Sequence, residues 1–191
     1  IICDLKYGTG EASEIAPRQV LINIIELLKK ENLKAIVAPE LEFYLCEQNL
    51  DPDLPLKTPV GKSGRRETGS RVFGIDAVNE FDALTDDIYD YCELMEIGVD
   101  TLVHESGPSQ IEINLNHGDP LALADQAFMF KRAVRQVALK HGIHATFMAK
   151  PYQGQPGSSM HIHQNLVSTK TNKNLFSDQE GNNSKEFLYY I

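Results

Sequence analysis

Acidic, amide and imidazole side chains alternate with apolar ones along three short stretches of the sequence. These polar residues are Glu40 and Glu42 in "PELEFYL", Gln110, Glu112 and Asn114 in "SQIEINL", and His161 and His163 in "SMHIHQNL". Because successive residues of a β-strand point to opposite faces, each stretch would present its polar groups together on one face of a sheet. Glu105 precedes the middle stretch and supplies a fourth carboxylate.

Four carboxylates and two imidazoles on one sheet surface would need compensation of their negative charge. If the three strands are neighbours, like charges a few ångströms apart in a partly dry site repel strongly. The stretches contain no comparable number of Lys or Arg residues. Divalent cations would remove the conflict, and carboxylates with an occasional imidazole suit magnesium or manganese better than structural zinc.

Each pair taken alone has a more ordinary interpretation. A Glu-x-Glu pair on a strand is usually part of a solvated outer face, and a His-x-His pair can be structural or belong to a jelly-roll oxygenase. The other histidines, His104, His117, His141 and His144, are assigned no metal role, and His141 is expected to be a favourable charge at a helix C-terminus. The metal hypothesis therefore depends on the combination of the three stretches.

Hydrophobic spacing and helix-end signals predict three longer helices around these strands. They run over about 17–30, 82–97 and 120–141, and the third has Asp119 as its N-cap and Gly142 as its C-cap. Their expected inner faces are Val20, Leu21, Ile24, Leu27 and Leu28; Leu84, Ile88, Tyr91, Cys92 and Met95; and Leu123, Ala127, Phe130, Val134 and Val137. The final "SKEFLYYI" is expected to begin another helix.

The remaining segments are expected to be strands and loops. Strands are predicted at about 37–45, 100–105, 110–116, 144–150 and 159–166, a hairpin turn at 168–174, and a long surface excursion at 48–70. Long excursions of this kind are often functional.

Composition restricts the class of protein. The 191 residues are 42% hydrophobic and 24% charged, which is ordinary for a globular protein, and the formal net charge is −9. Such an acidic balance argues against nucleic acid or an anionic membrane as a partner, and no apolar run is long enough for a membrane span. The three scattered cysteines predict a reducing, cytoplasmic location. The abrupt apolar start without Met predicts a piece of a longer protein.

Three ordered motifs resemble the glutamine synthetase family. They are "APELEFYL", "HESGPSQIEINL" and "MAKPYQGQPGSSMHIHQNL". The stretches "AVNEFDALTDDIYDYCEL" and "DTLVHE" are most similar to the γ-glutamylpolyamine (γ-glutamylputrescine) synthetase branch. The resemblance implies an α+β fold, with a curved and mainly antiparallel sheet backed by helices. Residues 1–191 would form the N-terminal half of the catalytic domain, without the preceding β-grasp-like domain and the C-terminal half.

The resemblance also implies roles for individual residues. Glu42, Glu105 and Glu112 match three glutamates that bind one divalent ion in the family. Glu40 and His161 match ligands of a second ion near the ATP phosphates, whose remaining glutamate lies later in the family's chain.

Three further positions would contact the nucleotide and glutamate. His163 and Asn165 match nucleotide-contacting positions, and Gly157 matches a loop glycine whose backbone helps to hold glutamate. Two residues depart from the ammonia-using enzymes: Pro156 replaces a common Asn, and Asn165 replaces a Ser. These departures put the detail of both contacts in doubt.

The implied activity is an ATP-dependent ligase that joins the γ-carboxylate of glutamate to an amine, with two Mg²⁺ or Mn²⁺ ions per site and ATP as co-substrate. Its partners would be glutamate, ATP, an amine and further copies of itself. Two alternatives remain open: glutamine synthetase proper, which uses ammonia, and a noncatalytic homologue that binds metal, nucleotide or a polyamine. The 191-residue chain alone is expected to be inactive.

Overall fold

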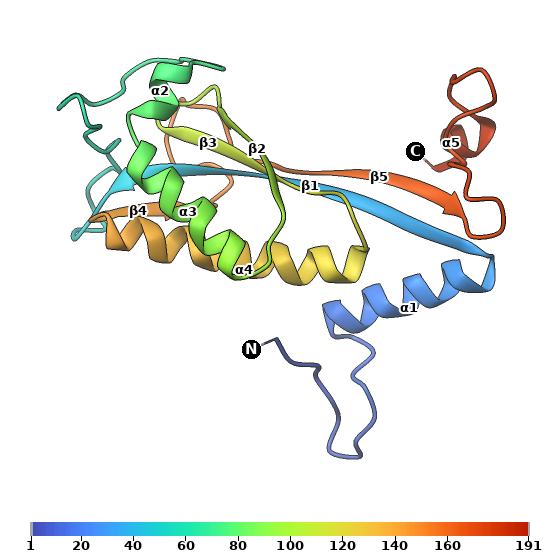
Figure 1. Cartoon of the computed structure of the whole chain (residues 1–191). Helices are drawn as coiled ribbons and strands as arrows, with labels where there is room; N and C mark the ends of the chain where they lie inside the picture. Colours follow the sequence, from blue (N-terminus) through green and yellow to red (C-terminus); the bar gives the residue numbers. More distant parts are fainter. Residues whose placement is uncertain (1, 191) are drawn as a thin grey trace. The chain divides into compact units, whose positions relative to one another are not determined.

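A five-stranded sheet forms the centre of the structure, a computed structural model that describes residues 2–190. Its strands are β1 (Leu33–Glu47), β2 (Val99–His104), β3 (Gln110–Leu115), β4 (Ile143–Thr146) and β5 (Met160–Ser168). The order is β2-β3-β1-β4, and β5 also pairs with β1 (Figure 1). The pairs β1–β3, β1–β4 and β2–β3 are antiparallel. The predicted α+β class with a mainly antiparallel sheet is confirmed.

Five helices accompany the sheet: α1 (Pro17–Lys30), α2 (Ile75–Asn79), α3 (Asp82–Leu94), α4 (Pro120–Lys140) and α5 (Lys185–Tyr190). The bounds of α1 agree with the prediction, whereas α3 ends three residues earlier than expected. The backbone of Glu96 is left-handed, with φ of 57°, which a continuing helix cannot accommodate. The last residue of the predicted final helix, Ile191, lies outside the described residues.

The chain divides into two compact units. Among the described residues, unit 1 comprises 2–38, 117–125 and 163–190, and unit 2 comprises 39–116 and 126–162. Strands β1 and β5 and helix α4 each contribute residues to both units.

The core of unit 2 lies between the sheet and its helices. Phe43 of β1 contacts Phe147 with ring centroids 5.2 Å apart, and Phe130 of α4 contacts the same ring at 6.4 Å. Ile111 of β3 pairs with Phe43 in register and is also buried. Because neighbouring strand residues point to opposite faces, Glu42 and Glu112 lie on the sheet face that is turned away from this aromatic cluster.

Helix α4 has the predicted end signals. The Asp119 carboxylate accepts hydrogen bonds from the backbone N–H groups of Leu121 and Ala122, each at 3.0 Å. Gly142 follows the helix with φ of +74°, a conformation that suits glycine. The predicted inner face of α4 is confirmed, since Leu123, Ala127, Phe130, Val134 and Val137 are all buried.

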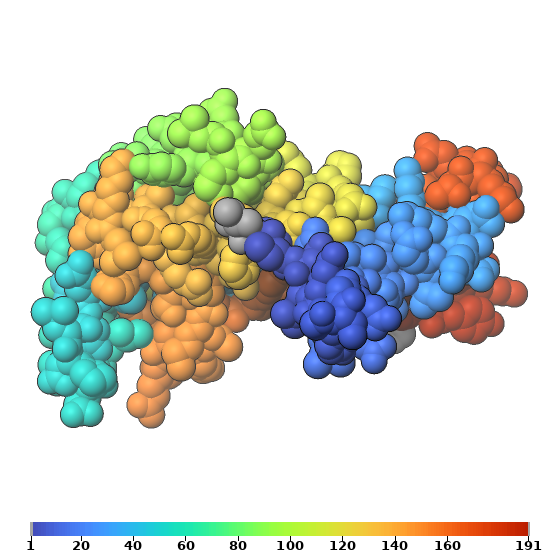
Figure 2. Space-filling model, turned by 90° about the horizontal axis from the view of Figure 1, so that it is seen from below, coloured from blue at the N-terminus to red at the C-terminus, as the bar shows by residue number. Residues whose placement is uncertain are grey.

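The predicted inner faces of α1 and α3 are wrong in part. No residue of α1 is buried, and Val20, Ile24 and Leu27 are each about half exposed. Tyr91 of α3 and Met95, which directly follows α3, are exposed and line a groove of about 230 Å³ against α4. Figure 2 shows α3 (green) bordering the residues of α4 (orange) on the face seen from below. Hydrophobic spacing identified these apolar faces but not how deeply they are covered.

The two predicted loop regions have the expected character. Residues 48–70 contain no helix or strand beyond an isolated bridge between Val60 and Arg66. The 168–174 segment turns tightly, with Val167 bridging Asn174. Across the described residues, no helix combines the length and apolar character needed to cross a membrane.

Candidate metal and substrate site

The pairing of β1 with β3 brings the predicted carboxylates face to face. Glu42 lies directly opposite Glu112, and Glu40 lies opposite Asn114. Residues opposite each other in an antiparallel pair have Cβ atoms about 5 Å apart. The negative charges of Glu42 and Glu112 are therefore cross-strand neighbours. The alternation seen in the sequence therefore produces a carboxylate pair that the backbone itself imposes.

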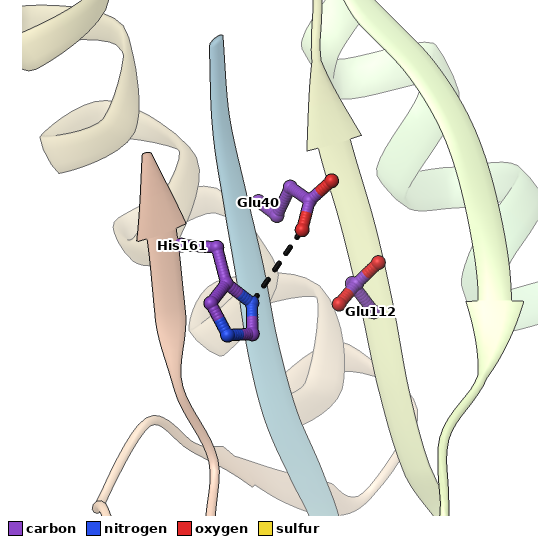
Figure 3. A group of neighbouring side chains, drawn as sticks. All are labelled: Glu40, Glu112 and His161. Carbon is purple, nitrogen blue, oxygen red and sulfur yellow. Dashed lines mark ion pairs between the residues drawn. The ribbon is translucent and has the colours of Figure 1, made fainter. Parts of the chain in front are cut away.

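His161 of β5 completes a compact group with two of these carboxylates. Ligand atoms of Glu40, Glu112 and His161 all lie within 4.8 Å of one another, and Figure 3 shows the three side chains converging from three strands. His161 Nδ1 is 3.5 Å from Glu40 Oε2 and 3.9 Å from Glu42 Oε1. The His161 side chain is 62% exposed, so the group opens to solvent.

Electrostatics at Glu112 reflect this crowding. Burial, followed by the negative charges of Glu40, Glu105 and Glu42, raises the pKa of the Glu112 carboxyl, and His161 acts weakly in the opposite direction. The other three predicted carboxylates thus all act on Glu112. A divalent cation would relieve the repulsion that these groups share.

Hydrogen bonds fix the orientation of Glu42, which is only 8% exposed. Its Oε2 accepts from Gln110 Nε2 at 2.9 Å and from the Ser159 backbone N–H at 3.1 Å, and its Oε1 accepts from the Ser159 hydroxyl. Both donors come from strands or turns that flank β1. Glu42 therefore presents a fixed carboxylate.

Gln110 links that carboxylate to the loop predicted to hold glutamate. Its amide nitrogen also donates to the backbone oxygen of Gly157 at 3.0 Å, while its Oε1 accepts from the Gly107 N–H at 2.9 Å. A Cβ at Gly157 would lie 2.8 Å from the backbone oxygen of Ala149, so this position requires glycine. The Gly157 backbone is consequently held at a fixed distance from the carboxylates.

Tyr44 also binds the loop that contains Gly157. Its hydroxyl donates to the Pro156 oxygen at 2.8 Å, and its ring meets Tyr152 edge-on at 5.1 Å. Burial, with a smaller contribution from Glu42 and Glu105, raises the pKa of Tyr44 to about 12. The hydroxyl thus keeps its proton and remains a donor at neutral pH.

The predicted nucleotide residues belong to unit 1. His163 and Asn165 lie on β5 beyond His161 and line a cavity of about 330 Å³, together with His117. Asn165 Oδ1 accepts a hydrogen bond from Asn174 Nδ2 at 2.9 Å. The structure therefore groups both residues around one hollow of unit 1.

Comparison with known proteins gives the family. The family described as "Glutamine synthetase, catalytic domain" matches residues 14–191. The chain belongs to the glutamine synthetase family. Among curated relatives, gamma-glutamylputrescine synthetase PuuA of Escherichia coli is 40% identical over 177 residues, which cover 92% of this chain and 37% of that protein.

Other members of the glutamine synthetase family are similar over the same span. Glutamine synthetase of Pyrococcus horikoshii is 35% identical over 185 residues, covering 97% of this chain and 39% of that protein. Among solved structures, a cryo-EM structure of Plasmodium falciparum glutamine synthetase has a TM-score of 0.80 at 26% identity and covers 98% of this chain and 41% of its own. The chain thus spans about two-fifths of the length of these relatives.

The side chains present in this glutamine synthetase family member suit a divalent cation. Carboxylate oxygens with one imidazole are the donors that magnesium or manganese accepts, and thiolates are absent from the group of Glu40, Glu112 and His161. Asn114 Oδ1, opposite Glu40, is buried and has no hydrogen-bond partner among the described residues. An unsatisfied buried oxygen beside carboxylates is consistent with a cation site.

Sequence reasoning missed several residues that organise this site. Ser159 could have been found, because it precedes His161 by two residues and so shares its face of the strand. Glu67 could not, since it lies in the 48–70 excursion, where no periodic pattern indicates a contact. Its carboxylate nevertheless meets the buried His104, next to Glu105, at 2.8 Å.

Proposed function

We propose that these residues belong to an ATP-dependent ligase that joins the γ-carboxylate of glutamate to an amine through γ-glutamyl phosphate. The observation that carries the proposal is the convergence of Glu40, Glu112 and His161, opposite Glu42 on the same sheet face and within reach of the Glu105 charge. Membership of the glutamine synthetase family supports it independently. Because the chain spans 37% of its PuuA relative, the proposal concerns a longer polypeptide that contains these residues.

The five side chains would hold two divalent ions, magnesium or manganese. Glu42, Glu105 and Glu112 would bind the ion near glutamate, and Glu40 with His161 would contribute to the ion near the nucleotide phosphates. The compact group of Glu40, Glu112 and His161 is consistent with Glu112 lying near both sets of ligands. Bound ions of this kind neutralise and align anionic reactants.

The chain's own groups would orient the substrates. The Gly157 backbone, held by Gln110, would contact glutamate, and the hollow lined by His163 and Asn165 would receive part of the nucleotide. In the first step a γ-carboxylate oxygen of glutamate bonds to the γ-phosphorus of ATP, and ADP leaves. In the second step the amine nitrogen bonds to the acyl carbon, phosphate leaves, and the nitrogen loses a proton. The protein would contribute position and electrostatics, without a covalent enzyme intermediate.

We further propose that the amine is a polyamine such as putrescine. The higher identity to a gamma-glutamylputrescine synthetase than to a glutamine synthetase, 40% against 35%, supports this choice. Pro156 also favours a polyamine. It stands where the ammonia-using enzymes commonly have Asn, and the loss of that side-chain amide changes the part of the Gly157 loop that would face the amine.

Phosphate release by the longer polypeptide tests both proposals. With ATP, glutamate and Mg²⁺ present, putrescine is expected to give at least about tenfold higher kcat/KM than ammonium, a difference of about 1.4 kcal/mol. Equal or better turnover with ammonium would identify glutamine synthetase proper. Binding of metal and nucleotide without phosphate release would identify the noncatalytic alternative.

A further inference from the structure

A buried pair of ionisable side chains lies directly behind Glu105. The His104 side chain is 1% exposed and that of Glu67 is 10% exposed, with His104 Nε2 2.8 Å from Glu67 Oε2. His104 closes β2, whereas Glu67 comes from the 48–70 excursion. The pair thus connects a surface loop to the end of the strand that precedes Glu105.

Both ring nitrogens of His104 are engaged. Nδ1 lies 2.7 Å from the backbone oxygen of Glu105. A carbonyl oxygen can only accept a hydrogen bond, so Nδ1 must carry a proton and donate it there. The imidazole therefore forms a bridge from the Glu67 carboxylate to the Glu105 peptide group.

The same carboxylate also holds the far side of the β2–β3 turn. Glu67 Oε2 accepts from the backbone N–H of Ser109 at 2.6 Å. Ser109 is fully buried and has φ of 58°, a left-handed conformation that is uncommon for a residue other than glycine. Glu67 thus fixes the turn through His104 before Glu105 and through Ser109 after it.

This arrangement leaves one oxygen unsatisfied. Glu67 Oε1 is buried and has no hydrogen-bond partner among the described residues. Burying a carboxylate this way is costly, and replacing a buried polar pair with apolar side chains is often neutral or stabilising. A gain in stability alone therefore does not explain why Glu67 and His104 occupy these positions.

We propose that Glu67 and His104 are positioning residues that fix the backbone at Glu105. They would thereby set the affinity for a divalent cation of the carboxylate face, formed by Glu40, Glu42, Glu105 and Glu112. The inference rests on the proposed function, because it takes Glu105 as a ligand. It also gives the 48–70 excursion a role, since the loop supplies the anchor. Hydrogen-bonding partners behind metal ligands commonly change metal affinity by about 10- to 100-fold when they are removed.

The test is Mn²⁺ affinity of the purified 191-residue chain, measured from the electron paramagnetic resonance signal of free Mn²⁺. Glu67→Ala is expected to weaken binding by about tenfold or more. Glu67→Gln can still accept a hydrogen bond from the Ser109 N–H but offers His104 no negative charge. Its loss of Mn²⁺ affinity should therefore lie between those of wild type and Glu67→Ala. Glu47→Ala is the matched control: Glu47 pairs with Arg66 of the same loop, and its removal deletes one negative charge without touching His104.

The control variant is expected to bind Mn²⁺ as wild type does. Wild-type affinity in Glu67→Ala, or an equal loss in Glu47→Ala, would overturn the inference while leaving the proposed function intact. If Glu67→Ala fails to fold by circular dichroism, Glu67→Gln decides, and unchanged affinity in that variant overturns the inference. A wild-type chain that binds no Mn²⁺ would contradict both this inference and the proposed site.

Discussion

At the scale of single residues, Glu112 combines a cost in stability with a proposed role in binding. Its burial opposes its ionisation, and so do the neighbouring charges of Glu40, Glu105 and Glu42. Glu112→Gln keeps the size of the side chain and removes one negative charge from the face. Mn²⁺ affinity should fall by about tenfold or more, equivalent to about 1.4 kcal/mol, because one charged ligand is lost. The exposed Glu93→Gln, with the same chemical change on α3, should leave the affinity unchanged.

The same substitution should stabilise the metal-free chain at neutral pH. The folded-state pKa of Glu112 is raised above its usual 4.5, so the folded state holds this proton more tightly than the unfolded state does. Its contribution is therefore most favourable below pH 4.5 and is lost as pH rises through the folded pKa. Urea unfolding of wild type and Glu112→Gln should differ more at pH 7 than at pH 4, with the variant more stable at pH 7. The same difference in unfolding free energy at both pH values would show that folding does not raise the pKa of Glu112.

A single substitution at Gln110 should disturb three hydrogen bonds of the site at once. Its amide serves Glu42, Gly157 and Gly107, and the side chain is 1% exposed. Gln110→Met retains the length but leaves these groups without their partner, which should cost about 2–4 kcal/mol. Urea denaturation measures the loss. The exposed Gln153→Met should change stability by less than about 0.5 kcal/mol, and a similar result for Gln110 would show that its bonds are replaceable.

The predictability of the site differs from residue to residue. Alternation placed Glu40 and Glu42 on one face, but the sequence could not show that Glu42 stands opposite Glu112, because register depends on packing and turn geometry. The contact made by Glu67 could not be predicted for a related reason. Its contact with His104 joins residues 37 positions apart through an aperiodic loop, and local patterns carry no information about such a contact.

At the scale of elements, α4 offers a direct test of an end signal. Asp119 accepts from two of the N–H groups that the first turn leaves unpaired. Asp119→Ala should therefore lower the unfolding free energy by about 1 kcal/mol, and the melting temperature by about 2–4 °C for a chain of this size. Asp119→Asn keeps the capping oxygen and should remain close to wild type. Equal losses in the two variants would assign the effect to charge.

Element prediction succeeded where the local signals were strong. The Pro17 start of α1 and the Asp119 start of α4 agree with the structure, since Pro and Asp act within one helical turn. Helix α2 was missed because its five residues are too few to display a helical period. The stripe of α1 was found but its burial was not: Ile24 is half exposed, and spacing cannot show what covers a face.

At the scale of the whole molecule, the distribution of arginines bears on whether these 191 residues suffice for turnover. Phosphoryl transfer between two anions requires cationic donors around the phosphate, and Arg matches phosphate geometry best. All six arginines precede β5. Arg18 pairs with Asp4 and Asp125, and Arg66 pairs with Glu47. Arg135 is exposed, and its guanidinium lies over the Phe147 ring at 5.2 Å, on the side of the sheet that faces away from the carboxylates.

We therefore expect the 191-residue chain to bind Mn²⁺ without showing amine-dependent ATP hydrolysis at saturating Mg²⁺. Metal binding needs only the carboxylates of unit 2, whereas phosphate must also be held by cations. Three of the six arginines, Arg18, Arg66 and Arg135, are already engaged by other groups. A longer polypeptide that adds the remaining three-fifths of its relatives' length should recover phosphate release in the same assay. The matched control is that longer polypeptide carrying Glu112→Gln, which should lose the recovered activity. Turnover by the 191-residue chain alone would show that the essential cations lie among its own residues and would place the phosphate elsewhere on the molecule.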